Sequence, residues 1–382
     1  LNTSTGGTHT IANAITGSGG IVQNGAGSTL VLSGANTYTG ATTVSAGTLG
    51  VSANNVLSSS TALSIAAGAT FDIGTTQQTV ASLSGAGTLH SGSSSARLAF
   101  GADNSSTAFS GNVANTWLNF EKFGTGTFTF SGTTSPAGGT FGIEAGTVVL
   151  TGGADTTNTF FNMQANTTLD IAGTVNGASV GFLFGGTGSA VHLGNRTLTI
   201  EHDSIRISTY MNGVIDGNGG LTLGQNSFLR VTNDNLYTGA TTLTGTNVEL
   251  ELRSAQAIAA SSELNIAASG AIVNVGFAGT DVSIRSLRGI AGGVLRVGDE
   301  NLVITHAAGD FAGVIERNFG KTGGLVLAGG HQTLSGINTY VGATTINGGL
   351  LTVNGSIATS SLTTVNAGGT LGGNGTVGNT AI

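Results

Sequence analysis

One eight-residue segment recurs along the chain and decides its fold. It reads Asn36-Thr37-Tyr38-Thr39-Gly40-Ala41-Thr42-Thr43 where it first occurs. It returns as Asn235-Leu236-Tyr237-Thr238-Gly239-Ala240-Thr241-Thr242 and as Asn338-Thr339-Tyr340-Val341-Gly342-Ala343-Thr344-Thr345. A divergent copy lies between residues 131 and 148, with Pro136 in place of the tyrosine and Gly138-Gly139-Thr140 in place of Gly-Ala-Thr. The chain therefore reads as four imperfect units of roughly one hundred residues, namely 1–108, 109–208, 209–309 and 310–382.

Apolar residues flank every copy of the motif with the period of a β-strand. In the first unit Leu30 and Leu32 precede it, and Leu49 and Val51 follow it, each pair separated by one variable residue. This alternation predicts strands with one buried face, which helices cannot produce. The equivalent positions predicted to be buried are Val44, Ile143, Leu243 and Ile346; Leu49, Val148, Val248 and Leu351; Val51, Leu150, Leu250 and Val353; Phe128 and Phe130; and Leu229 and Val231.

The fourth unit departs from this pattern just before its motif. Gln332 falls where the other units have the first apolar residue of the strand. A buried polar side chain is unfavourable unless it finds hydrogen-bond partners. We therefore expect Leu325 and Leu327 to supply the strand after a short insertion.

The composition favours an all-β protein. The chain has 66 glycines, one proline, no cysteine and 8% charged residues, while 39% of its residues are hydrophobic, enough for a continuous core. Glycine punctuates the predicted strand ends, where sharp corners are needed. Short strands separated by such corners can coil and pair in parallel with the next turn. We predict one continuous right-handed parallel β-helix over residues 1–382, a solenoid in which the motif residues are structural: Asn36, Tyr38, Gly40, Asn235, Tyr237, Gly239, Asn338, Tyr340 and Gly342.

The stretch from Gly25 to Gly40, continuing through Ala46-Gly47-Thr48-Leu49, resembles the passenger-associated transport repeat of bacterial autotransporters. The stretch from Asn366 to Val377 is similar to the same repeat. The resemblance implies a passenger domain that forms a right-handed β-helix, lies outside the cell at the bacterial surface or is released, and carries repeats that help export. Two parts of that family, a signal peptide and a translocator barrel, are not found in this sequence.

Charge and hydropathy exclude two kinds of partner. The net charge is −7, and the 11 lysines and arginines are scattered, with Arg285, Arg288 and Arg296 as the densest group. Nucleic acid would need a basic cluster, so we expect no nucleic-acid partner. No apolar run is long enough to span a bilayer as a helix.

Four segments contain residue types found in active or binding sites. Glu201-His202-Asp203-Ser204 has the groups of a hydrolase triad, but neighbours on a strand point to opposite faces and cannot converge. Asp299-Glu300 reads as a surface turn, Asp216-Gly217-Asn218-Gly219-Gly220 lacks the period of a calcium-binding β-roll, and Gly185-Gly186-Thr187-Gly188 opens no predicted helix. We predict no catalytic, metal-binding or cofactor-binding residue and no enzymatic activity.

Three functions stay open. The first is a rigid structural or adhesive stalk, either part of a longer chain or stacked end to end into extracellular filaments. The second is an adhesin whose divergent second unit binds a glycan or a host-matrix ligand. The third is a scaffold whose enzymatic domain lies outside this chain. The second unit is singled out by its aromatic residues, Trp117, Phe120, Phe123, Phe128, Phe130 and Phe141.

Overall fold

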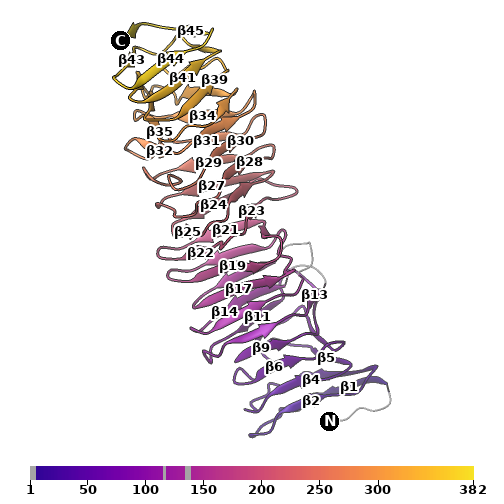
Figure 1. Ribbon diagram of the computed structural model, residues 1–382. Helices are drawn as coiled ribbons and strands as arrows, with labels where there is room; N and C mark the ends of the chain where they lie inside the picture. The colour runs from indigo at the N-terminus through magenta and orange to yellow at the C-terminus, as the bar shows by residue number, and fades with distance from the viewer. Residues whose placement is uncertain (1–5, 115–117, 134–138) are drawn as a thin grey trace. The chain divides into compact units, whose positions relative to one another are not determined.

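The computed structural model describes residues 6–114, 118–133 and 139–382. Within these residues the secondary structure consists of β-strands and no helix is found, so none is available to cross a membrane. Every pair of neighbouring strands that we describe is parallel (Figure 1). The predicted all-β parallel solenoid is confirmed. The chain divides into two compact units, Leu1–His192 and Leu193–Ile382, and continuity of one helix across both stays a prediction.

The strands form because their apolar residues alternate. In β3 (Ser28–Leu32), Leu30 and Leu32 are fully buried, whereas Val31 between them faces outward. The predicted buried positions of all four sequence repeats lie in the core, each with 7% or less of its surface exposed. Burying one face of each strand removes a continuous apolar stripe from water, which is the main favourable contribution to folding.

The first unit contains three parallel sheets whose neighbouring strands come from successive coils of the chain. One sheet has the order β1(Gly7–Ile11), β3, β5(Thr48–Val51), β7(Thr70–Gly74), β10(Thr88–Ser91), β13(Asn112–Ala114). A second has β2(Ile21–Gln23), β4(Thr42–Val44), β6(Ala62–Ile65), β9(Ser82–Gly85), β12(Thr107–Phe109), β15(Thr127–Phe130), β17(Thr147–Gly152), β19(Thr168–Thr174), β22(Ala190–His192). A third has β8(Gln77–Thr79), β11(Arg97–Phe100), β14(Asn119–Lys122), β16(Thr140–Ile143), β18(Phe160–Met163), β21(Phe182–Gly185), and β20 spans Ala178–Val180.

The second unit is built in the same way. Its first sheet has the order β24(Ile207–Met211), β27(Ser227–Val231), β29(Glu249–Leu252), β31(Ile272–Asn274), β34(Val294–Val297), β37(Val314–Arg317). Its second has β23(Leu198–Ile200), β26(Leu221–Leu223), β28(Thr241–Leu243), β30(Leu264–Ile266), β33(Leu287–Gly289), β36(Asp310–Phe311), β39(His331–Leu334), β41(Gly349–Val353), β44(Gly369–Gly372). Its third has β32(Val282–Ile284), β35(Leu302–Ile304), β38(Leu325–Leu327), β40(Thr344–Ile346), β43(Thr363–Val365), β46(Thr380–Ala381); β42(Ser356–Ile357) pairs with β45(Thr376–Val377), and β25 spans Val214–Asp216.

The register places equivalent core residues directly against each other in neighbouring coils. Leu30 lies opposite Leu49, and Leu32 lies opposite Val51. Phe128 lies opposite Val148 in the same way. Like side chains therefore stack in columns inside each unit, and a one-residue slip would turn a whole apolar face toward solvent.

The third repeat departs from the expected alignment. Leu229 lies opposite Leu250 and Val231 opposite Leu252, two residues later than the motif spacing predicted. The turn before β29 is longer than the corresponding turn of the first repeat, so Val248 is buried but precedes the strand. The prediction that Val248 and Leu250 take the places of Leu49 and Val51 is wrong.

The expectation for Gln332 is also wrong. Gln332 itself occupies the strand, opposite Leu351, and is fully buried. Leu325–Leu327 forms β38, which pairs with β40 and thus belongs to another sheet. The side-chain amide nitrogen of Gln332, Nε2, donates hydrogen bonds to the carbonyls of Leu287, Gly309 and Thr333, each at 3.0 Å. These bonds make a polar side chain tolerable in the core.

Replacing Leu30 by alanine tests the inward face of β3. The substitution should lower the free energy of unfolding by about 2–5 kcal/mol, because it leaves a cavity in a packed column. Val31→Ala in the same strand, on the outer face, should cost less than about 1 kcal/mol. Urea unfolding of the two variants measures the difference, and equal costs would contradict the assigned faces.

Candidate functional site

The motif asparagines join three successive coils. Asn235 is buried, and its Oδ1 accepts a hydrogen bond of 2.7 Å from the backbone nitrogen of Ile215, 20 residues earlier. Its Nδ2 donates to the carbonyl of Ala257, 22 residues later, at 2.8 Å. A strand corner would otherwise leave these backbone groups without partners, which is costly when buried. We call this arrangement the asparagine clip.

The other two motif copies repeat the clip. Asn36 accepts from the backbone nitrogen of Ile15 at 2.8 Å and donates to the carbonyl of Val56 at 2.7 Å. Asn338 accepts from the nitrogen of Ile315 at 2.8 Å and donates to the carbonyl of Ser356 at 3.1 Å. The same side chain thus makes the same pair of bonds in each complete copy, which accounts for asparagine at this place in the motif.

The motif tyrosines fill the core and end in a chain of hydroxyl groups. Tyr237 has 1% of its surface exposed, and its hydroxyl lies 2.6 Å from the Thr241 hydroxyl. Thr241 donates to Ser261 of the next coil, which in turn donates to the carbonyl of Gly239. Tyr340 makes the equivalent contact with Thr344 at 2.7 Å. Burial raises the pKa values of Tyr237, Tyr340 and Tyr38 above the ordinary value of the phenol.

The motif glycines mark where successive coils touch. A Cβ atom on Gly239 would lie 2.4 Å from the carbonyl oxygen of Gly219 in the preceding coil. On Gly342 it would lie 2.3 Å from the oxygen of Thr322. Any side chain would therefore force the coils apart, and only glycine fits. In the divergent copy, Pro136 and Gly138 lie outside the described residues, while Gly139 makes a close approach of the same kind, with a Cβ 2.1 Å from the oxygen of Leu118.

Lys122 is a buried polar residue that the sequence did not single out. It has 1% of its surface exposed, and its Nζ donates to the carbonyls of Phe123, Gly124 and Ala145 at 2.7–3.0 Å. Burial lowers the pKa of Lys122 to about 8. The amine ties the end of β14 to the following coil. The buried Gln23 amide acts locally, because it closes the turn after β2 by donating to Ser28. No local pattern distinguishes such a lysine from one on the surface.

The segment with hydrolase-type residues forms a turn between β23 and β24. Nδ1 of His202 accepts hydrogen bonds from the backbone nitrogens of Ser204 and Ile205, both at 3.3 Å. This nitrogen thus caps its own turn instead of facing a nucleophile, as a triad would require. Ser204 is exposed at the tip of the turn.

The remaining polar candidates also lie in surface turns. Asp299 accepts a hydrogen bond of 2.7 Å from Lys321, which lowers the pKa of Asp299. Gly219 packs against the backbone of Arg196, and Gly186 packs against Ala165, so both glycine-rich segments serve close contacts between coils. Across the described residues, no three His, Asp or Glu side chains gather where they could hold a metal ion.

The aromatic residues of the second repeat lie mostly inside the solenoid. Phe120 and Phe141 pack with tilted rings, their centroids 5.2 Å apart, and Phe141 stacks on Phe161 at 5.4 Å. Phe120, Phe128, Phe130 and Phe141 are each 4% exposed or less. They form an aromatic core and offer no surface to a ligand. Phe123 is partly exposed, and Trp117 lies outside the described residues.

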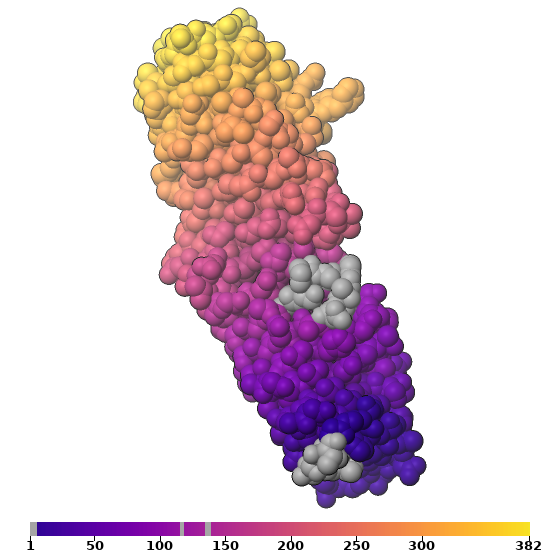
Figure 2. Space-filling model, turned by 90° about the vertical axis from the view of Figure 1, so that its right-hand side faces the viewer, coloured from indigo at the N-terminus to yellow at the C-terminus, as the bar shows by residue number. Residues whose placement is uncertain are grey.

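The hollows on the surface are shallow. One is lined by Arg206, Ser208, Phe228 and Glu249 on the first sheet of the second unit. Another is lined by small residues of β12 and β15 and their turn. No deep cleft opens in the coloured surface on the face that Figure 2 shows. The described surface thus offers broad faces for contact more than an enclosed site.

Comparisons with known proteins give one family and one relative. The family model described as the passenger-associated-transport-repeat matches residues 21–51, 120–150 and 329–353. The adhesin BmaC autotransporter of Brucella suis biovar 1 (strain 1330) is 33% identical over 369 residues, which cover 91% of this chain and 10% of the relative. The chain thus spans about a tenth of the length of that relative. No solved structure matches the chain.

Removing one asparagine clip should destabilise the coils that it joins. Asn235→Ala leaves the Ile215 nitrogen and the Ala257 carbonyl without their partner, so the free energy of unfolding should fall by about 2–4 kcal/mol. Asn218→Ala, at an exposed position in the preceding coil, is the matched control and should change it by less than about 0.5 kcal/mol. Urea unfolding followed by circular dichroism measures both, and a neutral Asn235→Ala would refute the clip.

The buried tyrosines should make the fold sensitive to alkali. A folded-state pKa above that of the unfolded chain means that the unfolded state releases protons first, so stability is lost as the pH rises above about 10. Tyr237→Phe removes one such group. Between pH 9 and pH 11 its unfolding free energy should fall by about 1 kcal/mol less than that of the unsubstituted chain. Denaturant unfolding at the two pH values measures this, and an identical fall would show that Tyr237 ionises freely in the folded protein.

Proposed function

Because this chain is a bacterial autotransporter passenger domain with passenger-associated transport repeats, we propose that it is a non-enzymatic structural and adhesive segment that acts outside the cell. In this proposal the solenoid holds its outer faces in fixed positions for contact with other surfaces. It is displayed at the bacterial surface or released from it.

The asparagine clip is the observation that carries the proposal. Each complete motif copy uses its most distinctive polar side chain to join three coils, with Asn36, Asn235 and Asn338 in the same role. The repeated polar residues are therefore committed to holding coils together, whereas an enzyme needs polar groups that converge on a substrate. A solenoid of nearest-neighbour contacts can also add one coil at a time after export.

The name of the relative supports the adhesive part of the proposal. That relative is named an adhesin, and it aligns with nearly all of this chain. Since the aligned part is a tenth of the relative, adhesion by this segment alone is part of the proposal. A glycan or host-matrix ligand and end-to-end stacking into filaments both stay predictions.

Display on a non-adherent bacterium, through an autotransporter translocator, tests the proposal. The chain should resist surface proteolysis and raise attachment to host cells at least about threefold over the translocator alone. A variant with Asn36→Ala, Asn235→Ala and Asn338→Ala should lose protease resistance and attachment together, because local opening exposes the backbone. Folded, protease-resistant chain that gives no attachment above the translocator alone would contradict the adhesive role.

A further inference from the structure

The outer face of the first sheet in the second unit carries large and charged side chains. The register sets Arg230 beside Glu251, Glu251 beside Asn274, Asn274 beside Arg296, and Arg296 beside Glu316. These five residues form one column across β27, β29, β31, β34 and β37, which we call the charged column. Outer positions of β5 and β7 in the first unit are small, with Thr48 beside Thr70.

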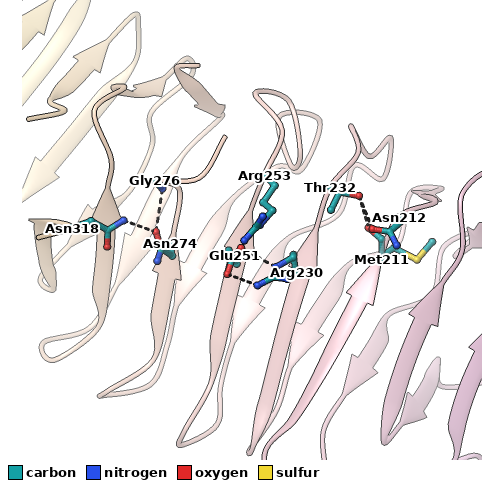
Figure 3. Close-up of polar contacts among 9 residues, drawn as sticks. All are labelled: Met211, Asn212, Arg230, Thr232, Glu251, Arg253, Asn274, Gly276 and Asn318. Atoms are coloured by element: carbon teal, nitrogen blue, oxygen red, sulfur yellow. Dashed lines mark hydrogen bonds and ion pairs between the residues drawn. The ribbon is translucent and has the colours of Figure 1, made fainter. Parts of the chain in front are cut away.

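Ion pairs hold the charged column in place. Glu251 is 5% exposed and receives both Arg230 and Arg253, with Arg230 Nε 2.9 Å from its Oε1 (Figure 3). The Arg230 guanidinium also lies over the Tyr210 ring, 4.9 Å from its centroid. Arg296 Nε lies 2.8 Å from Glu316 Oε1. Fixed side chains lose little entropy when a partner binds, so this face is prepared for contact.

The order of charges along the column is its own complement when reversed. From β27 to β37 it reads positive, negative, neutral, positive, negative, with Asn274 at the centre. A rotation of 180° about an axis along β31 reverses the order of the strands and keeps each position along its strand. It places Arg230 opposite Glu316 of a second copy, and Asn274 opposite its own equivalent. A twofold interface requires this kind of self-complementary surface.

We propose that this face binds a second copy of the same chain in an antiparallel arrangement. The accessible charges fit, since Arg230 is 26% and Glu316 is 33% exposed. The same rotation brings Arg253, which is 38% exposed and follows β29, to a similar position along the strands as the turn at Asp299 and Glu300, which follows β34 of the second copy. Opposite charges would thus meet at both ends of the column and twice in each dimer.

A second column supplies apolar contact. Ile272, Val294 and Val314 lie side by side next to the charged column and are partly exposed. The same rotation sets Ile272 against Ile272 of the second copy. It sets Phe228, at the other end of the column, against Val314 of the second copy. It also sets Glu249, whose carboxylate is already paired with Arg206, against Val294 of the second copy. An apolar centre beside charged pairs is the usual composition of a specific interface.

The size of the face predicts a weak dimer. Five strands spaced about 4.8 Å apart span roughly 19 Å, so the contact falls at the small end of specific interfaces. Single pairs should form only at concentrations on the order of 100 µM. Many copies on facing surfaces would nevertheless hold together through avidity. The inference rests on the adhesive role proposed above and gives it a partner.

A charge-swap experiment on the purified full chain tests the inference. Sedimentation equilibrium should detect reversible dimers of the unsubstituted chain. Arg230→Glu and Glu316→Arg should each weaken association at least about tenfold, because like charges then face each other. An equimolar mixture of the two variants, and the double variant R230E/E316R, should restore it to within about threefold. Thr48→Arg in the first unit is a control that should leave association unchanged.

Rescue separates pairing from damage to the fold, since a variant that merely misfolds is not restored by mixing. Circular dichroism of each variant checks the fold directly. A chain that stays monomeric up to about 1 mM, or single variants that associate as well as the unsubstituted chain, would overturn the inference. Attachment to host cells without self-association would overturn this inference alone and leave the proposed function standing.

Discussion

Backbone pairing between successive coils is the constraint on which the rest of the structure depends. The backbone groups of an interior strand find their partners only in the coils before and after it, so each coil must repeat the path of its neighbours. Inward positions then form columns, as Leu30 and Leu49 do. Where the chain turns between sheets, some backbone groups lose their partners in neighbouring coils. The motif asparagines and glycines occur at these turns. Asn235 replaces missing backbone partners, while Gly239 lets two coils touch.

The sequence predicted most of this architecture because one repeat carries its signal at fixed spacing. The alternation around Leu30 and Phe128 predicted buried faces without any knowledge of pairing. It failed where a side chain satisfies the same constraint by other means. Gln332 occupies an apolar position because three carbonyls accept hydrogen bonds from its amide, and two of them, those of Leu287 and Gly309, come from other coils. The residues near Lys122 in the sequence do not predict its burial, because a carbonyl that accepts its hydrogen bonds belongs to the following coil. The longer turn before β29 shifts the pairing of β29 with β27 by two residues from the predicted one.

The same constraint separates what can vary from what cannot. Inward residues and the motif are held by contacts with neighbouring coils, whereas outward residues contact one another and solvent. One face can therefore carry threonines, as Thr48 and Thr70 do, and another can carry Arg230, Glu251 and Arg296 without changing the fold. The functional residues of such a chain should be sought as columns that cross several strands, and motifs local in sequence are poor guides to them. The candidate catalytic segment around His202 illustrates this, because its neighbours in sequence only close a turn.

The central claim is that side chains of the motif complete the pairing between coils, and amide hydrogen exchange tests it most directly. The amide of Ile215 donates to Asn235, so it should exchange as slowly as amides within the neighbouring strands β26 and β28. In Asn235→Ala, protection should fall at Ile215 and in the coil that holds Ala257, while the strands around Leu30 in the other unit keep theirs. Fast exchange at Ile215 in the unsubstituted chain, or a variant with unchanged protection there, would contradict the account.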